Sequence, residues 1–173
     1  MKISFFALHL GYGGVEKYII TLANMLCKKH DVEILTTYKI YDKPSFALDE
    51  RVKVTYLMKE VPNKEAFYIA KKSRNYIAMI KEGIKSVYIL WKRKKVNVKA
   101  VKNCNADVII STRIFHNEII AKYAKENTIL ITSEHNHPCG NEQYIQDVLN
   151  STQKFDYLLP ISKELTNLYK ERG

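Results

Sequence analysis

A glycine-rich stretch near the N-terminus is the first place in this sequence where chemistry can be expected. The run LHLGYGGVEK places Gly11, Gly13 and Gly14 between an apolar segment and the start of an amphipathic helix. Glycine lets a backbone approach a phosphate closely, and the free N–H groups and dipole of a helix N-terminus favour an anion. The stretch predicts a phosphate-binding loop, with a tight turn that needs glycine as the alternative.

Two common nucleotide-binding signatures do not fit this loop. The dinucleotide fingerprint requires glycine where Glu16 stands, and the next expected strand ends in Thr36, Thr37 and Tyr38 without an acid for the ribose. The P-loop signature requires a Gly-Lys-Ser/Thr triplet, which does not follow here. The loop is therefore not a generic nucleotide site.

Histidines make up the second group of chemically capable residues. The run LITSEHNHPCG contains His135, His137 and Cys139, and His9 and His116 follow other expected strands. These side chains could bind zinc, but H-x-H-x-C is not a common structural zinc spacing and a fourth ligand must come from elsewhere. No G-x-S-x-G elbow is present, and Cys139 lacks a supporting triad pattern. We predict no metal and no hydrolase centre.

The net charge of +10 comes from one segment. Residues 64–102 contain twelve Lys or Arg against two acidic residues, whereas the other residues balance at sixteen of each sign. Apolar residues recur there at helical spacing, with aromatic residues among the lysines. Three readings are open: a helix packed on a sheet with a solvated basic face, adsorption on an anionic membrane, or nucleic-acid binding.

The elements that position these residues alternate between strand and helix. Such alternation predicts an α/β fold with a Rossmann-like, doubly wound, mostly parallel sheet. Ligands on such sheets bind at the carboxyl ends of the strands, so we expect the site in loops 9–14, 112–116, 133–140 and 161–163. The expected strands are residues 2–8, 32–37, 52–57, 107–111, 128–132 and 156–159, and the expected helices begin after Gly14, within residues 63–95, at His116 and at Ser162.

Length and composition limit the class of protein. A chain of 173 residues fits one globular domain, and no apolar run reaches the roughly 18 residues of a membrane span. The first apolar run is brief and no signal-peptide cleavage pattern follows it. Three widely spaced cysteines argue against a disulfide framework and favour a reducing cytosol.

Three of these stretches, in order, resemble the N-terminal domain of family-4 retaining glycosyltransferases, which have the GT-B fold. The first is a strand followed by GGVEK and the apolar helix IITLANML. The second, LITSEHNHP, is similar to the family's strand that ends in a histidine facing the cleft. The third, FDYLLPISKELTNLYKERG, is similar to the stretch that leads into the second domain. The resemblance covers nearly the whole chain.

The resemblance implies roles for particular residues. Gly13 and Gly14 match the loop that approaches the donor diphosphate and the acceptor, and Glu16 and Lys17 match the residues that open the following helix. His135 matches the histidine that contacts the transferred sugar, which makes it the candidate catalytic residue. The remaining candidates are Ser162 near the interdomain hinge, additional cleft residues His9, His116 and His137, and membrane-facing basic residues Lys92, Arg93, Lys94 and Lys95.

The resemblance also implies the reaction. A nucleotide-sugar donor would transfer its sugar to an acceptor hydroxyl with retention of configuration, without a metal or other cofactor. The family's E-x7-E motif belongs to a C-terminal donor-binding domain that we expect to be absent from residues 1–173. Glu164 and Glu171 share that spacing by coincidence, because they lack the surrounding residues of the motif. We expect one acceptor-side domain, inactive alone, that is either cut from a longer enzyme or one subunit of a split enzyme.

Partners and location follow from the same resemblance. Related enzymes often use lipid-linked acceptors, which favours a membrane over nucleic acid as the partner of the basic segment. We therefore expect a sugar or lipid-linked acceptor, an anionic membrane surface, no nucleic acid, and a cytoplasmic protein at the inner face of the membrane. The alternative function is a non-catalytic acceptor-binding or membrane-associating subunit of a split glycosyltransferase.

Overall fold

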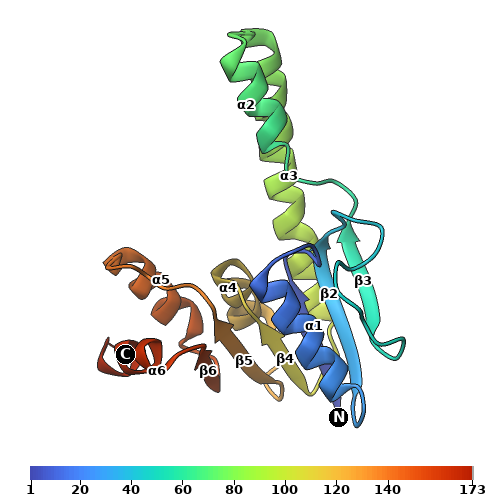
Figure 1. The fold of residues 1–173 in the computed structure, drawn as a ribbon, viewed down its shortest axis with the longest axis vertical. Helices are drawn as coiled ribbons and strands as arrows, with labels where there is room; N and C mark the ends of the chain where they lie inside the picture. Colours follow the sequence, from blue (N-terminus) through green and yellow to red (C-terminus); the bar gives the residue numbers. More distant parts are fainter. Residues whose placement is uncertain (173) are drawn as a thin grey trace.

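The computed structural model describes residues 1–172 and contains a six-stranded, all-parallel sheet of order β3-β2-β1-β4-β5-β6 (Figure 1). All neighbouring strands pair in parallel. This confirms the predicted Rossmann-like, doubly wound α/β fold. The strands are β1 (Lys2–Ala7), β2 (Asp31–Tyr38), β3 (Lys53–Met58), β4 (Val108–Ser111), β5 (Ile129–Glu134) and β6 (Tyr157–Pro160).

The described part of the chain contains six helices. One of them, α5, was not predicted, because its sequence EQYIQDVLNST is mostly polar and its apolar stripe is short. Asn141 caps it by accepting a 3.0 Å hydrogen bond from the Tyr144 N–H. The helices are α1 (Gly14–Leu26), α2 (Lys64–Lys72), α3 (Tyr76–Asn103), α4 (Ile114–Tyr123), α5 (Glu142–Thr152) and α6 (Lys163–Arg172).

Helices cover both faces of the sheet, which explains why its central strands are apolar along their whole length. On one face, Phe5 of β1 belongs to a buried cluster with Ile19 of α1. On the other face, Phe6 belongs to a cluster with Val101 of α3 and Ile120 of α4. Successive side chains of β1 point to opposite faces of the sheet, so each one packs against the helices on its own face.

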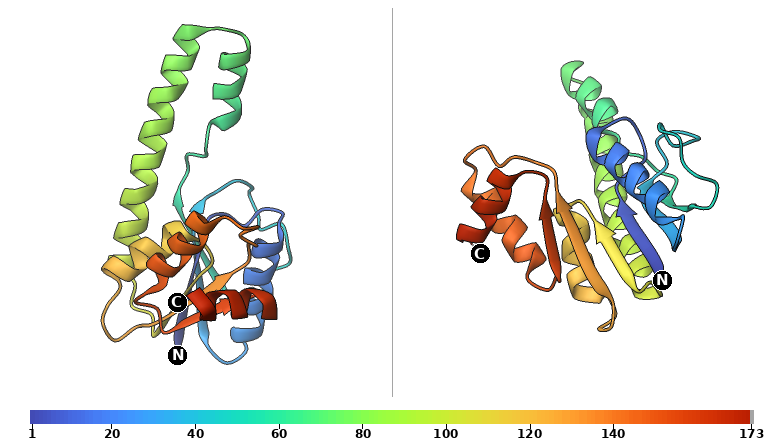
Figure 2. Two further views of the ribbon diagram at one scale, coloured as in Figure 1. Left: turned by 90° about the vertical axis from the view of Figure 1, so that its left-hand side faces the viewer. Right: turned by 60° about the horizontal axis from the view of Figure 1, so that its bottom comes forward.

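A helical hairpin projects from this body (Figures 1 and 2). The prediction of one helical segment within residues 63–95 was wrong, because the chain reverses between α2 and α3. Arg74 has a φ of 55° at the reversal, and Asn75 caps α3 by accepting a 3.0 Å hydrogen bond from the Ala78 N–H. Asn63 at the start of α2 donates a 2.9 Å bond to the Glu82 carbonyl and so ties the two helices together.

Only the lower part of α3 packs on the sheet. Ile89, Asn97 and Val101 are buried there. The apolar stripe of α3 is exposed, so the predicted packing of this segment on the sheet holds only for the C-terminal part of α3. The stripe consists of Ile77, Ile80, Ile84, Val87 and Trp91, each 57–83% exposed. None of the helices within residues 1–172 is long and apolar enough to cross a bilayer.

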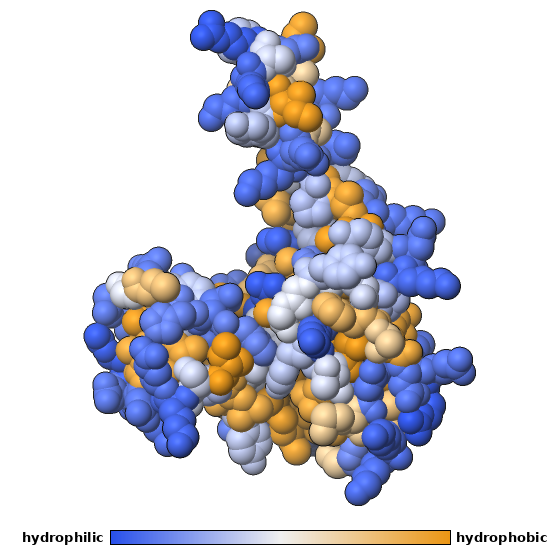
Figure 3. All heavy atoms as spheres, in the orientation of Figure 1, coloured by the Kyte–Doolittle hydropathy of each residue, from blue (hydrophilic) through white to orange (hydrophobic). Residues whose placement is uncertain are grey.

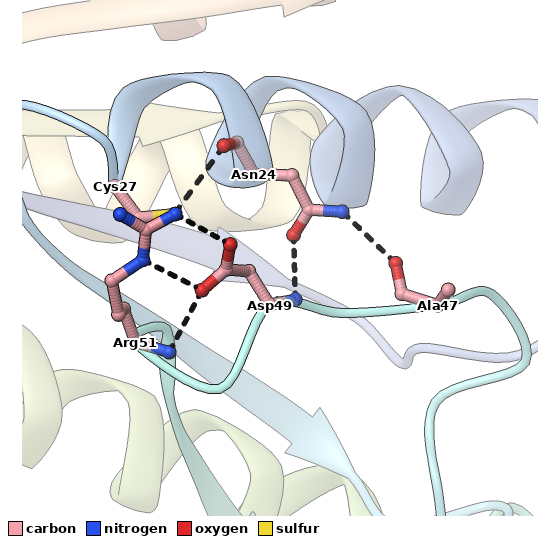
Figure 4. A network of polar contacts seen from close by, with 5 residues as sticks. All are labelled: Asn24, Cys27, Ala47, Asp49 and Arg51. Carbon is pink, nitrogen blue, oxygen red and sulfur yellow. Dashed lines mark hydrogen bonds and ion pairs between the residues drawn. The ribbon is translucent and has the colours of Figure 1, made fainter.

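The loop between β2 and β3 is held against α1 by a polar network (Figure 4). Asn24 of α1 donates a 2.9 Å hydrogen bond to the Ala47 carbonyl and accepts one of 2.9 Å from the Asp49 N–H. Arg51 donates two bonds to the Asp49 carboxylate, which hold the pKa of Asp49 well below its usual range. The network fixes a loop whose aromatic residues lie over the glycine stretch, as the edge contact between Tyr41 and Tyr12 shows.

Candidate functional site

The glycine stretch follows β1 and opens α1. Gly13 immediately precedes the helix with extended backbone, a φ of 165°. The buried Glu16 carboxylate folds back over it, so that a Cβ at Gly13 would collide with Glu16 Oε2. A Cβ at Gly14 would meet no atom within 4 Å. The close approach of Glu16 therefore favours glycine at position 13, because a side chain there would push the flexible Glu16 carboxylate aside. Gly14 has no such constraint.

We expect Gly13→Ala to lower the free energy of unfolding by about 1–2 kcal/mol, because the displaced Glu16 loses its buried contacts. Gly14→Ala is the matched control, and because it makes no clash at the start of α1 it should leave stability unchanged or raise it by up to about 1 kcal/mol. Urea unfolding of the two variants measures the difference. Equal effects of the two substitutions would show that the Glu16 contact contributes nothing to stability.

Glu16 connects α1 to the loop after β4. Its Oε1 lies 3.4 Å from an Arg113 guanidinium nitrogen, and both side chains stand at the carboxyl edge of the sheet. His9 Nδ1 lies 3.6 Å from the same oxygen. Because His9 Nδ1 already accepts a 3.2 Å hydrogen bond from the Gly11 N–H, this approach is a proximity and not a hydrogen bond.

His135 faces α1 directly after β5. Its ring makes an edge contact with Tyr18 at a centroid distance of 4.5 Å, and its Nε2 is buried without a hydrogen-bond partner. Burial lowers the pKa of His135, the Arg113 charge lowers it further, and Glu16 opposes the shift. The imidazole is therefore neutral at neutral pH, and its buried Nε2 has unused hydrogen-bonding capacity.

A cavity of about 250 Å3 lies between the carboxyl ends of β1, β4 and β5. Arg113 lines it, whereas the predicted site residues Gly13, Glu16 and His135 do not. Glu134 at the end of β5 accepts a 2.9 Å hydrogen bond from the Tyr144 hydroxyl, and burial raises the pKa of Tyr144 to about 12. That tyrosine therefore stays protonated. The lining residues are Leu8, Arg93, Thr112, Arg113, Ile114, Phe115, Glu134, Asn136 and Tyr144.

Several residues of this region were not singled out from the sequence. Arg113 lies in the loop that the strand-end rule selected, and Glu134 directly precedes the predicted His135. Their positions at strand ends indicated a place in the site. As charged residues, however, they could not be distinguished from ordinary surface charges. Tyr18 gave no signal, because an aromatic residue on an amphipathic helix usually belongs to the core. Tyr144 gave none, because the helix that carries it was not predicted.

Other predicted candidates lie apart from the cavity. His116 is fully buried under the sheet, with Nε2 3.1 Å from the Thr37 hydroxyl. His137 is exposed and 3.4 Å from Glu164. Ser162 caps α6 by accepting a 3.2 Å hydrogen bond from the Leu165 N–H. Within residues 1–172, no three His, Cys, Asp or Glu side chains gather as a metal site would require, and Cys139 stays free.

The basic run on α3 is divided between two environments. Lys92 pairs with Glu60, and the Arg93 guanidinium stacks on the Phe115 ring at 4.0 Å from its centroid. These two residues therefore do not share the exposed face predicted for them. Lys94 and Lys95 are exposed, and Lys95 lies over the Trp91 ring at 4.8 Å.

No family model matches the sequence. Over 148 residues, 84% of this chain, it is 34% identical to the GalNAc-α-(1→4)-GalNAc-α-(1→3)-diNAcBac-PP-undecaprenol α-1,4-N-acetyl-D-galactosaminyltransferase of Campylobacter jejuni, of which the match covers 34%. Over 131 residues, 71% of this chain, it is 30% identical to an exopolysaccharide phosphotransferase of Streptomyces coelicolor, of which the match covers 14%. The chain thus spans about a third or less of the length of these curated relatives. These similarities to transferases of sugar-containing substrates support a glycosyltransferase family for this chain.

Proposed function

We propose that this chain is the acceptor-side domain of a retaining glycosyltransferase of the GT-B, family-4 type, which extends a lipid-linked sugar. The observation that carries the proposal is the convergence of the glycine loop, Arg113 and His135 at one sheet edge, joined by Glu16. The Campylobacter relative, named for a transfer onto an undecaprenol diphosphate sugar, supports the acceptor class.

The residues of the site fit the charge changes of such a transfer. The bond between the sugar and its diphosphate breaks, a bond to the acceptor oxygen forms on the same face, and the hydroxyl proton leaves. The N-terminus of α1 and the Arg113 guanidinium are suited to the negative charge of the departing diphosphate. The neutral His135 is suited to hydrogen-bond the transferred sugar. The proposal needs no metal, and it assigns the main donor site to protein outside these 173 residues.

Sugar transfer tests this function. We expect the full product of the gene to move labelled sugar from a nucleotide-sugar to a lipid-linked acceptor, and His135→Gln to slow transfer about 100-fold. His30→Gln, at the opposite end of the sheet before β2, should leave the rate unchanged. Residues 1–173 alone should show no transfer.

Two results would contradict the proposal. Transfer by residues 1–173 alone would remove the need for a separate donor site. A full gene product that binds the acceptor without transferring sugar would instead indicate the non-catalytic subunit of a split enzyme.

We also propose that the hairpin of α2 and α3 adsorbs to an anionic membrane at the cytoplasmic face. Hydrophobic and basic residues lie side by side along it (Figure 3). A second copy of the chain is a poor cover for the apolar stripe, because each hairpin would bring the same large positive charge. An anionic lipid surface buries the apolar stripe and attracts the lysines. Each lysine near the surface contributes about 1 kcal/mol to binding.

A further inference from the structure

The cavity beside His135 lies at the point where the winding of the sheet reverses. In the order β3-β2-β1-β4-β5-β6, the chain leaves β1 toward one side and β4 toward the other. Such a reversal opens a crevice at the carboxyl ends of the two strands, and ligands of open α/β sheets bind in it. Leu8 after β1 and Thr112 after β4 line the cavity from its two sides.

The N-terminus of α4 faces this cavity without a cap. Arg113 occupies the capping position, but its side chain makes no capping hydrogen bond, and the first turn contains no acidic residue. The cavity is lined by Arg113, Ile114 and Phe115, which form the start of this ten-residue helix. No acidic side chain of α4 itself therefore compensates the positive end of the helix dipole.

Two buried polar groups beside the helix start also lack partners. Thr112 is only 3% exposed, and its Oγ1 has no hydrogen-bond partner within residues 1–172. Arg93 Nε is buried and unpartnered as well. The Arg93 guanidinium is stacked on Phe115, and no ion pair of Arg93 occurs among the described residues. Buried polar groups without partners are costly, so a ligand with acceptor oxygens would satisfy them.

The acidic groups nearby are already engaged. Glu134 lines the cavity, but its Oε1 accepts hydrogen bonds from the Asn136 N–H at 2.7 Å and the Tyr144 hydroxyl at 2.9 Å. Glu16 contacts Arg113 at 3.4 Å, a long contact that a better-placed anion could replace. Neither of the two Glu134 bonds involves its Oε2, so the cavity combines one carboxylate oxygen with the donors of Arg93, Arg113 and Thr112.

We propose that this cavity is a phosphate-binding subsite, in which Arg93, Arg113, the Thr112 hydroxyl and the first N–H groups of α4 hold a phosphoryl group of a substrate. Arginine forks and helix N-termini are the protein groups best suited to phosphate oxygens. The assignment of that phosphate to a substrate of sugar transfer rests on the proposed function. The diphosphate of a nucleotide-sugar and that of a lipid-linked acceptor share this chemistry.

Titration calorimetry with inorganic pyrophosphate tests the subsite on the chain itself. We expect saturable binding by the wild type, at least tenfold weaker binding by Arg93→Met, and a severalfold loss in Thr112→Val. Methionine keeps an apolar side chain on Phe115, and thermal unfolding verifies that each variant folds. Lys99→Met removes the same charge from an exposed position of α3 and should bind pyrophosphate like the wild type.

Two further ligands distinguish the source of the phosphate. A nucleoside diphosphate that binds more tightly than pyrophosphate, and loses that advantage in Arg93→Met, identifies the donor. The same pattern with a short isoprenyl diphosphate identifies the acceptor lipid. No saturable binding of pyrophosphate, or equal losses in Lys99→Met and Arg93→Met, overturns the subsite.

Failure of the subsite can be told apart from failure of the proposed transferase. Pyrophosphate binding that depends on Arg93 supports the subsite even when the full gene product transfers no sugar. Sugar transfer without pyrophosphate binding refutes the subsite and leaves the transferase proposal standing.

Discussion

Binding to anionic vesicles should fall at least 100-fold when Ile80 and Ile84 are both replaced by serine. Both side chains are about two-thirds exposed on the projecting part of α3, so neither supports the fold. Fully burying an apolar side chain of this size is worth about 1.5–3 kcal/mol, so the loss of two costs about 3–6 kcal/mol. A 100-fold change corresponds to about 2.8 kcal/mol, at about 1.4 kcal/mol per factor of ten. Vesicle flotation with and without anionic lipid measures the effect.

The control for this prediction is Met25→Ser. Met25 is also exposed, at 62%, but it lies on α1 in the body of the protein. It should leave vesicle binding unchanged. The membrane proposal fails if the wild type does not float with anionic vesicles, or if the double variant floats as well as the wild type. A wild-type dimer that the double variant converts to monomer would instead assign the stripe to a second copy of the chain.

The stability of the protein should fall by about 1.4 kcal/mol for each pH unit below about 6.5, because of one histidine. Burial lowers the pKa of His116 from 6.5 to about 3, and the charges of Arg93 and Arg113 contribute. Below pH 6.5 the unfolded chain binds a proton that the folded protein excludes. The stabilisation is therefore fully present above pH 6.5 and is lost as the pH falls toward 3, a total of about 5 kcal/mol.

The structure explains why this histidine resists protonation. The Thr37 hydroxyl donates to Asn97 Oδ1 at 3.2 Å, so His116 Nε2 must carry the proton that it shares with Thr37 at 3.1 Å. His116 Nδ1 is buried without a partner. A second proton there would create an unpaired charge next to two arginines.

Urea unfolding at pH 7.0, 5.5 and 4.5 measures this dependence. His116→Gln is the control, since glutamine can donate a hydrogen bond but does not titrate. Between pH 5.5 and 4.5 the variant should lose about 1.4 kcal/mol per unit less than the wild type. If the free energy of unfolding falls equally with pH in the two proteins, His116 binds a proton as readily in the folded state as in the unfolded state.

The local pattern of the sequence was sufficient for the sheet. Runs such as KISFFAL are apolar at every position because both faces of a parallel sheet are covered, and helical spacing between them implies crossover connections. The rule that parallel strands present their carboxyl ends at one edge then selected the loops after β1, β4 and β5. The predicted loops 112–116 and 133–140 do line one cavity together with Leu8, whereas no residue of the predicted loops 9–14 and 161–163 lines it.

Tertiary structure alone decided which side chains act together there. Glu16 and Arg113 are 97 residues apart, and nothing in their sequence neighbourhoods indicates that they meet. Arg93 reads as one of four consecutive basic residues, yet it stacks on Phe115. A run of basic residues in the sequence shows only that the charges are consecutive. The rotation of the long helix α3 against the sheet determines which of these side chains points inward.

The hairpin shows the same limit from the other direction. Its spacing correctly predicted an apolar stripe with lysines beside it, because amphipathic periodicity is a property of a single helix. The sequence could not show what covers that stripe, since burial depends on where the helix points after it leaves the domain. Here α3 extends beyond the sheet, so the apolar stripe that the periodicity predicted is left exposed.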